Sequence, residues 1–525
     1  MGEEKFYITT PIYYVNANPH IGHAYTQVIV DTLARYHRLL GHRTFFLTGT
    51  DEHGEKIEEA SIKAGFEKGG EKAFVDAIVV NFRNVWKTLG IEYDGFIRTT
   101  DPAHKAVVQE FLIKMKDAGD IYLGEYDGCF CTPCETFWTD TQAEGGLCPD
   151  CRRPVDRIRE KNYFFRMSGY QDWLIGYIND NPRFIMPEFR KNEVMGFLRE
   201  KLNDLCISRP KERMSWGIEL PFDPDYVVYV WFDALINYVS GVQGDDRPKG
   251  LWPADVHVIA KDILRHHAVY WPIMLKSVGM PQPGTIFAHG WWKMGDEKMS
   301  KSRGNIVDPV ALAARYGVDA VRYFLLRSVS LGMDGSFNED ALVKLYNSDL
   351  ANDLGNLLNR TLTMVEKYFG GIAPEAPDSG IDEAQKKRSD GLNRHDLLAR
   401  VNSRVLDRGL YLKEALEEIM AVVGKANKYI EESAPWQYSK QGKMEEIRII
   451  MADLLENLRI VAIGIYPFMP DTARRMWEQM GLPGAIEEKI DAAELAGGRD
   501  FTGNWRKFPP GIKVAKGEPL FPRIQ

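Results

Sequence analysis

Short apolar runs alternate with amphipathic stretches at the start of the chain. Residues 6–10 are β-branched and aromatic, which predicts a strand. From about Gly22 to Leu39, apolar residues recur at three- and four-residue intervals, which predicts a helix with one buried face. Residues 42–48 form the next strand candidate, and a long helical region follows from about Glu55 to Leu89. This alternation favours a parallel sheet.

A second set of apolar runs follows a long insertion. Predicted strands cover residues 227–231, 257–260 and 285–288, and a helix is expected to open after residue 261. We interpret these strands as the continuation of the same sheet. The predicted fold class is therefore α/β, with a doubly wound, Rossmann-like parallel sheet that is split by the insertion.

The last third of the chain has a helical pattern. Leucines recur at helical spacing between residues 342 and 362, and further helices are expected around residues 399–432 and 444–465, beyond a linker rich in Pro, Gly and acidic residues. This pattern predicts a helical bundle. The predicted segments are the first half of the sheet domain at 1–118, the insertion at 119–226, the second half of the sheet domain at 227–338, the helical domain at 339–508 and an extended tail at 509–525.

Composition narrows the class of protein. The chain has 525 residues, 44% of them hydrophobic, and no run of about 18 apolar residues that could cross a membrane. The N-terminus lacks the pattern of a secretory signal, so a cytoplasmic location is expected and no membrane partner. The net charge of −8 argues against a protein that coats nucleic acid by overall attraction, although a local basic track stays possible.

Four of the six cysteines form two Cys-x-x-Cys pairs. Four thiolates suit one closed, tetrahedral zinc site with a structural role, although the loop between the pairs is slightly short for this class. A redox pair is the alternative, and Cys129 is close enough to compete as a ligand. The predicted zinc ligands are Cys131, Cys134, Cys148 and Cys151.

Two further motifs carry candidate chemistry. His20 and His23 lie at the predicted strand-to-helix turn, where exposed helix N–H groups attract anions, although such a pair could also be half of a metal site. Lys298 and Lys301 lie on a loop that is bounded by glycines and is therefore expected to be mobile. Considered without the histidine motif, this charged stretch could be an ordinary solvated surface. The chain has no Gly-x-Gly-x-x-Gly motif after its first strand and no P-loop, so neither holds a nucleotide.

Together, these two motifs carry a family resemblance. His20-Ile21-Gly22-His23 and Lys298-Met299-Ser300-Lys301-Ser302 resemble the hallmark motifs of class I aminoacyl-tRNA synthetases. Nearly the whole chain is similar to the methionyl-tRNA synthetases, including residues 10–14, 50–54, 230–234, 259–263, 433–436 and 520–524. The resemblance implies a ligase that activates L-methionine with ATP to methionyl-adenylate and pyrophosphate. This ligase would then transfer the methionyl group to tRNA(Met), both the initiator and the elongator tRNA.

The resemblance also implies site residues in the sheet domain. His20, His23, Lys298 and Lys301 would be catalytic by stabilising the phosphates of ATP, which Mg²⁺ accompanies. The further residues expected to bind ATP are Asp262, His289 and Gly290. Asp51 would bind the ammonium group of methionine, with Tyr14 beside it. The methionine side chain would contact Ile12, Trp231, Ala234, Leu235, Tyr238, Ile263, His267 and Trp271, although plain core packing is the alternative for the large aromatic residues.

For the helical domain, the resemblance implies recognition of the anticodon of tRNA. Trp436 would stack on an unpaired base, and Asn352, Asn356 and Arg360 would face it. The alternative for Trp436 is a structural tryptophan at a helix boundary. The chain ends before an appended dimerising domain could fit, so a monomer is expected. Ala260, where glycine is expected, and His266, where an apolar aromatic residue is expected, depart from the family pattern.

Two other functions compete with this hypothesis. One is another nucleotidyl-transferring enzyme of the same superfamily, such as a cysteinyl enzyme or a small-molecule adenylyltransferase. The other is a non-catalytic RNA-binding protein. The helical last third of the chain argues against a small adenylyltransferase. A cysteinyl enzyme would bind its substrate with thiolates in the active site, whereas the paired cysteines of this chain lie in the insertion. The intact histidine and lysine motifs argue against a protein that has lost its catalytic function.

Overall fold

The computed structural model describes most of the chain, namely residues 4–16, 18–132, 136–138, 140–149, 152–244, 247–295, 297–298, 306–375, 383–392, 396–407, 409–496 and 508–524. It divides into two compact units. We name Lys5–Val30 with Thr44–His289 the sheet unit. The helical unit consists of the chain up to Glu4, residues 31–43 and the chain from Gly290 onward.

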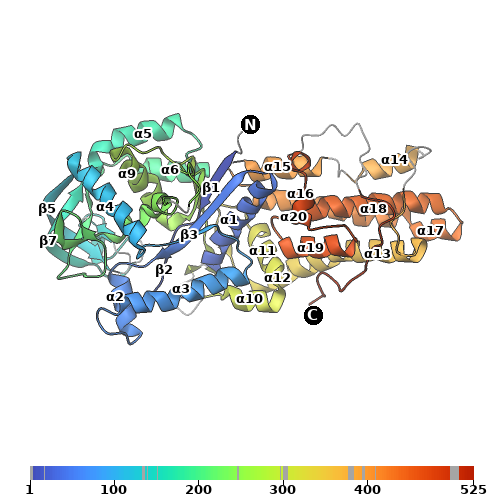
Figure 1. Cartoon of the computed structure of the whole chain (residues 1–525), viewed down its shortest axis with the longest axis horizontal. Coiled ribbons are helices and arrows are strands. Elements are labelled where there is room, and N and C mark those ends of the chain that lie inside the picture. The colour runs from blue at the N-terminus through green and yellow to red at the C-terminus, as the bar shows by residue number, and fades with distance from the viewer. Residues whose placement is uncertain are drawn as a thin grey trace. The chain divides into compact units, whose positions relative to one another are not determined.

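A seven-stranded sheet organises the sheet unit (Figure 1). Its strands follow the order β2-β3-β1-β13-β14-β8, and β4 also pairs with β3. β1 pairs in parallel with β13, and β13 in parallel with β14. Their inner residues are fully buried, as in a sheet covered on both faces. The predicted parallel sheet is confirmed, with strands β1 (Lys5–Thr9), β2 (Tyr13–Tyr14), β3 (Arg43–Asp51), β4 (Gly95–Arg98), β8 (Ile185–Met186), β13 (Val256–Ala260) and β14 (Thr285–His289).

Helix α1 (Ile21–Leu39) matches its prediction closely. The helical region predicted from Glu55 to Leu89 is instead two helices, α2 (Glu55–Lys63) and α3 (Glu71–Thr88). Gly65 and Gly69 lie between them with φ values of 88° and 92°, which break the helix because an α-helix requires negative φ. The other helices of the sheet unit are α4 (Pro102–Asp117), α5 (Gln171–Asp180), α6 (Glu188–Phe197), α7 (Val230–Leu235), α8 (Asn237–Ser240) and α9 (Trp271–Ser277).

The inserted segment is built on a long antiparallel hairpin. Strand β5 (Ile121–Cys131) pairs with β7 (Asp156–Phe165) along its length, and β6 (Thr136–Trp138) and β9 (Leu205–Cys206) flank the pair. The same segment supplies β8, which pairs in parallel with β14. The insertion therefore contributes a strand to the parallel sheet.

The expected strand at Val227–Trp231 is wrong as a member of the parallel sheet. Strand β12 (Asp223–Val228) ends there and pairs antiparallel with β10 (Ser208–Pro210) and β11 (Glu219–Leu220). Val230 then begins helix α7. A short apolar run fits a buried strand and a buried helical turn equally well, so periodicity does not distinguish them.

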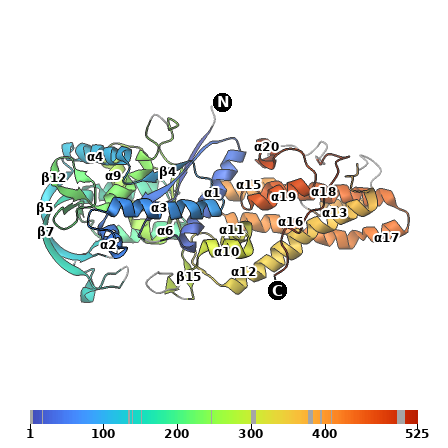
Figure 2. The same ribbon diagram turned by 60° about the horizontal axis from the view of Figure 1, so that its bottom comes forward.

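The helical unit is a bundle, as predicted. Its long helices α13, α16 and α18 lie side by side (Figures 1 and 2), and every residue of α18 from Ile449 to Ile465 is buried. Its helices are α10 (Pro309–Tyr316), α11 (Val318–Arg327), α12 (Glu339–Leu345), a π-helical stretch (Tyr346–Gly355), α13 (Asn356–Phe369), α14 (Glu383–Asp390), α15 (Leu397–Leu406), α16 (Leu412–Ser433), α17 (Pro435–Lys440), α18 (Met444–Ile465), α19 (Pro470–Gln479), α20 (Ile486–Lys489) and α21 (Ala492–Leu495). A small sheet adds β15 (Trp292–Met294), β16 (Glu297–Lys298) and β17 (Gly335–Ser336).

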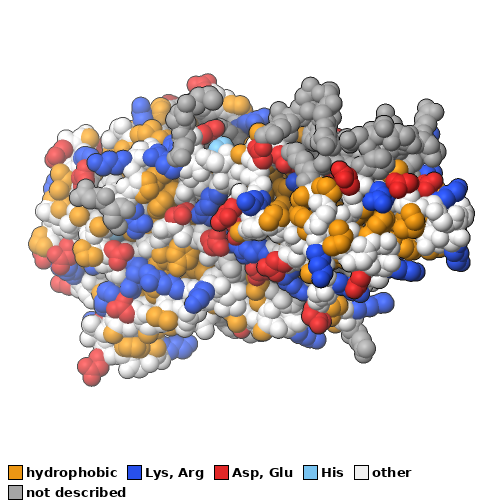
Figure 3. All heavy atoms as spheres, turned by 45° about the vertical axis from the view of Figure 1, so that its right-hand side comes forward, with side chains coloured by type: hydrophobic (Ala, Val, Ile, Leu, Met, Phe, Trp, Pro, Cys, Tyr) orange, Lys and Arg blue, Asp and Glu red, His pale blue; other side chains and the backbone are white. Residues whose placement is uncertain are grey.

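The tail of the chain packs on the helical unit through backbone and side-chain contacts. Lys513 forms a β-bridge with Ile372, and the Asn347 amide exchanges two hydrogen bonds with the backbone of Ile524. On the face shown in Figure 3, basic and acidic side chains lie interspersed among hydrophobic ones. Within the described residues, no helix has both the length and the hydrophobicity to span a bilayer.

Candidate active site

Two stacked histidines form the turn into helix α1. The ring centroids of His20 and His23 are 3.9 Å apart with an interplanar angle of 24°. His20 Nδ1 accepts a hydrogen bond from the Gly22 N–H at 3.0 Å, and His23 Nδ1 accepts one from the His20 N–H at 3.2 Å. Because each Nδ1 is an acceptor, each neutral ring carries its proton on Nε2. The turn thus presents two imidazole N–H donors at a helix N-terminus, which suits an anion.

Glycine at position 22 leaves room for the His20 ring. A Cβ on Gly22 would lie 2.9 Å from Cε1 of His20, which is closer than real Cβ contacts. His23 also packs edge to face on Tyr13, at 5.0 Å between centroids. These contacts hold both rings in one orientation.

The carboxyl ends of β13 and β14 supply the other predicted ATP-binding residues of the sheet unit. His289 ends β14, is buried, and its Nε2 lies 2.8 Å from the Thr26 hydroxyl of α1. Asp262 is exposed in the 3₁₀ turn (Lys261–Ile263) that follows β13. The structure therefore brings the start of α1 and the end of β14 together, at the edge where parallel sheets bind ligands.

The remaining ATP-binding candidates belong to the helical unit. Gly290 packs so closely on the chain that a Cβ there would lie 2.1 Å from the Met333 carbonyl oxygen. The backbone of Lys298 lies in β16, opposite Lys293. The Lys298 side chain and the whole of Lys301 lie outside the described residues, so their roles stay predictions.

Asp51 and Tyr14 are neighbours in the sheet, as the predicted substrate pocket requires. They form a register pair between β3 and β2, and the Val15 N–H donates to the Asp51 carbonyl oxygen at 3.3 Å. Tyr14 packs edge to face on Trp231 at 6.3 Å between centroids. Trp231 in turn stacks on His266 at 4.0 Å. An acidic group thus lies near an aromatic surface built from distant parts of the chain.

The deeper aromatic residues share a hydrogen-bonded network. His267 Nδ1 donates to the Ile263 carbonyl oxygen at 2.9 Å, so its neutral Nε2 accepts from the Tyr238 hydroxyl at 2.7 Å. Trp271 donates its indole N–H to His257 Nε2 at 3.3 Å. His257 Nδ1 therefore carries the proton that faces the Thr9 hydroxyl at 2.7 Å.

Burial keeps the histidines of this cluster neutral. It lowers the pKa of His267 to about 4, although the Ile263 carbonyl opposes the shift. Burial also lowers the pKa values of His257 and His266 well below the usual range. A neutral His266 stacked on Trp231 packs as an aromatic ring does, which accounts for histidine where an apolar aromatic residue was expected.

The smaller predicted pocket residues are also buried or half-buried. Ala234 and Leu235 lie on α7, three and four residues after Trp231 in the sequence. Ile12 packs against the cluster of Tyr7 and Leu47, and Ile263 packs against the main core of the unit. All ten residues predicted to contact the amino-acid substrate thus lie in the sheet unit.

Sequence reasoning missed a buried network beside this pocket. Asp233 on α7 accepts hydrogen bonds from His53 Nδ1 at 2.7 Å and from His104 Nε2 at 2.6 Å. Burial opposes ionisation, but the two histidines lower the pKa of Asp233 to about 2. His53 lies two residues after Asp51, and Asp233 two residues after Trp231. Their closeness in sequence to the candidate residues Asp51 and Trp231 was the signal that could have identified His53 and Asp233.

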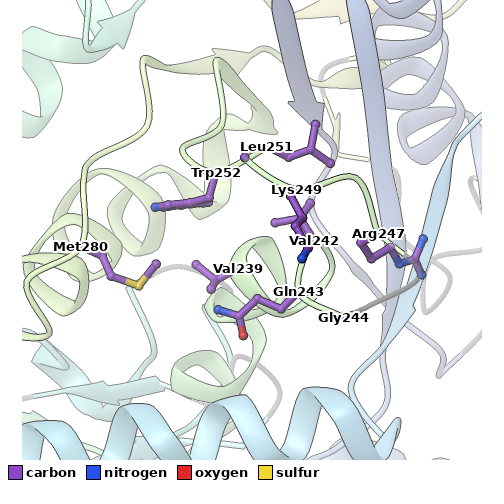
Figure 4. Close-up of a pocket in the computed structure, with 10 residues that line it drawn as sticks. Val239, Val242, Gln243, Gly244, Arg247, Lys249, Leu251, Trp252 and Met280 are labelled. Atoms are coloured by element: carbon purple, nitrogen blue, oxygen red, sulfur yellow. The ribbon is translucent and has the colours of Figure 1, made fainter.

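A separate pocket is lined by residues between Val239 and Trp252 and by Met280 (Figure 4). It has a volume of about 300 Å³ and combines apolar residues with the cations Arg247 and Lys249. Trp252 lines it and packs edge to face on Trp271 at 5.8 Å. The predicted substrate residues do not line this pocket.

Two of the four predicted zinc ligands are described. Cys131 and Cys148 are fully buried in one cluster with Trp138 and Ala143. Cys134 and Cys151 lie outside the described residues, and the described side chains alone form no group of three or more metal-ligating residues. Desolvation and Asp140 raise the pKa of the Cys129 thiol.

The predicted anticodon residues lie in the helical unit. Trp436 is 36% exposed on α17, next to a tight turn at Ala434, which has φ 42°. Asn352 and Asn356 are exposed one turn apart, and Arg360 lies one turn further. Arg360 forms an ion pair with Glu431 at 2.6 Å. An aromatic side chain and two amides are thus available to solvent.

Comparison with known families covers almost the entire chain. A model described as "tRNA synthetases class I (M)" matches residues 6–158 and 153–362. A second, described as the anticodon binding domain of methionyl tRNA ligase, matches residues 390–525.

Individual relatives agree with these family models. The chain is similar to the methionine–tRNA ligase of Caldanaerobacter subterraneus, with 47% identity over 99% of this chain and 79% of that protein. The Thermotoga maritima methionine–tRNA ligase is 44% identical over 99% of this chain and 80% of its own length. The solved Mycobacterium tuberculosis methionyl-tRNA synthetase in complex with methionyl-adenylate superposes with a TM-score of 0.90, at 40% identity over 99% of this chain and 100% of that chain.

Proposed function

Because this chain belongs to the methionyl-tRNA synthetase family of class I, we propose that the carboxyl edge of its parallel sheet is the site of methionine–tRNA ligation. The chain activates L-methionine with ATP to methionyl-adenylate and pyrophosphate, and transfers the methionyl group to tRNA(Met), initiator and elongator. The observation that carries the site is the stacked His20–His23 pair at the start of α1, which presents two N–H donors at the sheet edge.

Activation needs no nucleophile from the protein. The methionine carboxylate attacks the α-phosphate of ATP and pyrophosphate leaves, so the protein contributes positioning and charge stabilisation. His20 and His23 donate their Nε2 protons to phosphate oxygens. Asp262, His289 and Gly290 contact the nucleotide, and Lys298 and Lys301 add positive charge at the phosphates. Mg²⁺, which accompanies ATP, neutralises part of the phosphate charge.

The aromatic cluster selects the amino acid. Asp51 binds the methionine ammonium group beside Tyr14, and the thioether enters among Trp231, Tyr238 and Trp271. Sulfur makes favourable contacts with aromatic rings. The Tyr238 proton is directed to His267, so the Tyr238 oxygen offers a lone pair rather than a donor to the pocket. The pocket is completed by Ile12, Ala234, Leu235, Ile263 and His267.

The cysteine cluster holds one structural zinc ion. The burial of Cys131 and Cys148 in one small cluster supports this assignment, because it brings together one predicted ligand from each Cys-x-x-Cys pair. Cys134 and Cys151 complete the four-thiolate set by their spacing. Zinc bound by these cysteines would crosslink the two Cys-x-x-Cys segments and would supply structural stability rather than chemistry.

The helical unit reads the anticodon of tRNA(Met). Trp436 stacks on an unpaired base, and the exposed amides of Asn352 and Asn356 bind base edges. The ion pair with Glu431 orients Arg360, which contacts a base or a phosphate of the anticodon loop. A monomeric state and a cytoplasmic location complete the proposal, and sedimentation of the purified chain tests the first.

Amino-acid-dependent exchange of pyrophosphate into ATP tests the activation step. Methionine should drive exchange, and cysteine and leucine should not. Charging of tRNA(Met) tests the second step, and His20→Asn combined with His23→Asn should abolish exchange while leaving the fold intact.

A further inference from the structure

A fully buried carboxylate links the two segments that hold methionine in the proposed function. Asp233 is 1% exposed and lies on α7 between Trp231 and Ala234. His53 follows Asp51 at the end of β3 and is also 1% exposed. Their contact of 2.7 Å joins segments that are 180 residues apart.

A second histidine, His104 on α4, forms a hydrogen bond with the same carboxylate. His104 Nε2 lies 2.6 Å from the other Asp233 oxygen, and His104 Nδ1 lies 2.7 Å from the Ser240 hydroxyl of α8. An ionised carboxylate only accepts hydrogen bonds, so both histidines donate to it. The Asp233 carboxylate on α7 is thereby linked by hydrogen bonds to α4, to α8 and to the end of β3.

The hydrogen bond to Asp233 requires a proton on Nδ1 of His53. Its Nδ1 donates to Asp233, and its Nε2 makes no hydrogen bond within the described part of the chain. Rotation of the ring, or a shift of its proton to Nε2, would leave Asp233 with one donor fewer. A buried carboxylate that loses a donor is destabilised strongly, so the network has a single low-energy arrangement.

We infer that Asp233 is a positioning residue for methionine, which through His53 and His104 fixes α7 relative to the end of β3. In this arrangement, Trp231 and Ala234 are held at a set distance from Asp51, so the side chain and the ammonium group of methionine are bound together. This inference rests on the assignment of these residues to the methionine pocket. The hydrogen bonds of the network join α7 to the end of β3, to α4 and to α8, so ATP binding is not expected to depend on them.

Kinetics of pyrophosphate exchange test the inference through separate KM values for methionine and ATP. Asp233→Asn keeps the shape but replaces one acceptor by a donor, so one histidine loses its partner. The KM for methionine should rise about tenfold or more, and the KM for ATP should change less than about twofold. Asp453→Asn is the matched control. Asp453 is equally buried in the helical unit, where it accepts from the Tyr429 hydroxyl, and its variant should leave both KM values unchanged.

A pair of His53 variants separates positioning from folding. The amide nitrogen of Asn occupies nearly the position of Nδ1, so His53→Asn retains the donor to Asp233, whereas His53→Ala removes it. We expect His53→Asn to recover most of the methionine affinity that His53→Ala loses. Equal losses in both variants, or equal increases in both KM values for Asp233→Asn, would overturn the inference. If the wild-type chain shows no methionine-dependent exchange, the proposed function fails instead, whatever Asp233 does.

Discussion

The Tyr238 hydroxyl lies 2.7 Å from His267 Nε2, and the Tyr238 ring packs against His257 and Trp271. Because His267 Nδ1 already donates to the Ile263 carbonyl oxygen, the ring accepts the tyrosine proton only while it is neutral. Protonated His267 would present a donor to the hydroxyl and reverse the direction of that hydrogen bond. The hydrogen bond that Tyr238 donates to His267 therefore depends on a neutral imidazole.

The first prediction concerns stability at acidic pH. In the folded chain, burial lowers the pKa of His267 to about 4, whereas the unfolded value is about 6.5. Between these values the unfolded chain binds a proton that the folded chain does not. The free energy of unfolding should therefore be highest above pH 6.5 and fall as the pH drops toward 4. His257 and His266 act in the same direction.

Substitution of one histidine tests this linkage. His267→Asn keeps a donor for the Ile263 carbonyl but does not titrate. Between pH 6 and 5, the slope of unfolding free energy against pH should decrease by about 1 kcal/mol per pH unit. Denaturant unfolding at several pH values measures it. An unchanged slope in this variant would show that His267 titrates normally in the folded chain.

The second prediction concerns the close approach at Gly290. Because a Cβ there would lie 2.1 Å from the Met333 carbonyl oxygen, Gly290→Ala must displace backbone. We expect a loss of about 1–3 kcal/mol of stability and a lower rate of exchange. Gly176→Ala is the control, because Gly176 lies in α5 with open space around its Cβ position and should gain up to about 1 kcal/mol. Equal stability of the Gly290 variant and the wild type would contradict the predicted clash.

The third prediction concerns zinc. The purified chain should carry one zinc ion, and Cys148→Ser should lose it because one thiolate ligand is removed. Cys206→Ser should retain the metal, since Cys206 lies on β9 and burial raises its pKa to about 11, which keeps the thiol protonated. Metal analysis by mass spectrometry gives the count. A folded wild-type chain without metal, or full zinc content in Cys148→Ser, would refute the assignment.

The fourth prediction separates the two units by function. Loss of base stacking costs about 1–3 kcal/mol, so Trp436→Ala should raise the KM for tRNA(Met) by about tenfold or more. Exchange of pyrophosphate needs no tRNA and should stay near the wild-type rate. Phe189→Ala removes a similarly exposed aromatic ring from the sheet unit and serves as the control. A parallel loss of charging and exchange in the Trp436 variant would argue for a structural role.

The sequence predicted the elements whose pattern is local. Strands β1, β13 and β14 and helix α1 follow directly from apolar spacing. The run at residues 227–231 was misassigned because a short buried helix and a buried strand share that pattern. The network of Asp233, His53 and His104 was missed, because the sequence places His53 and Asp233 close to candidate residues but does not show the contacts, which join residues more than one hundred positions apart. The tautomers of His257 and His267 likewise became clear only from their partners.

Methionine-dependent exchange of labelled pyrophosphate into ATP is the most direct test of the central claim, that the stacked histidines at the start of α1 serve methionine activation. The wild-type chain should exchange with methionine at a rate far above that with cysteine or leucine. The combined His20→Asn and His23→Asn variant should lose exchange by about 100-fold or more, since two charge-assisted hydrogen bonds to the phosphates are removed. Exchange driven equally by cysteine or leucine, or a folded double variant that exchanges at the wild-type rate, would contradict the account.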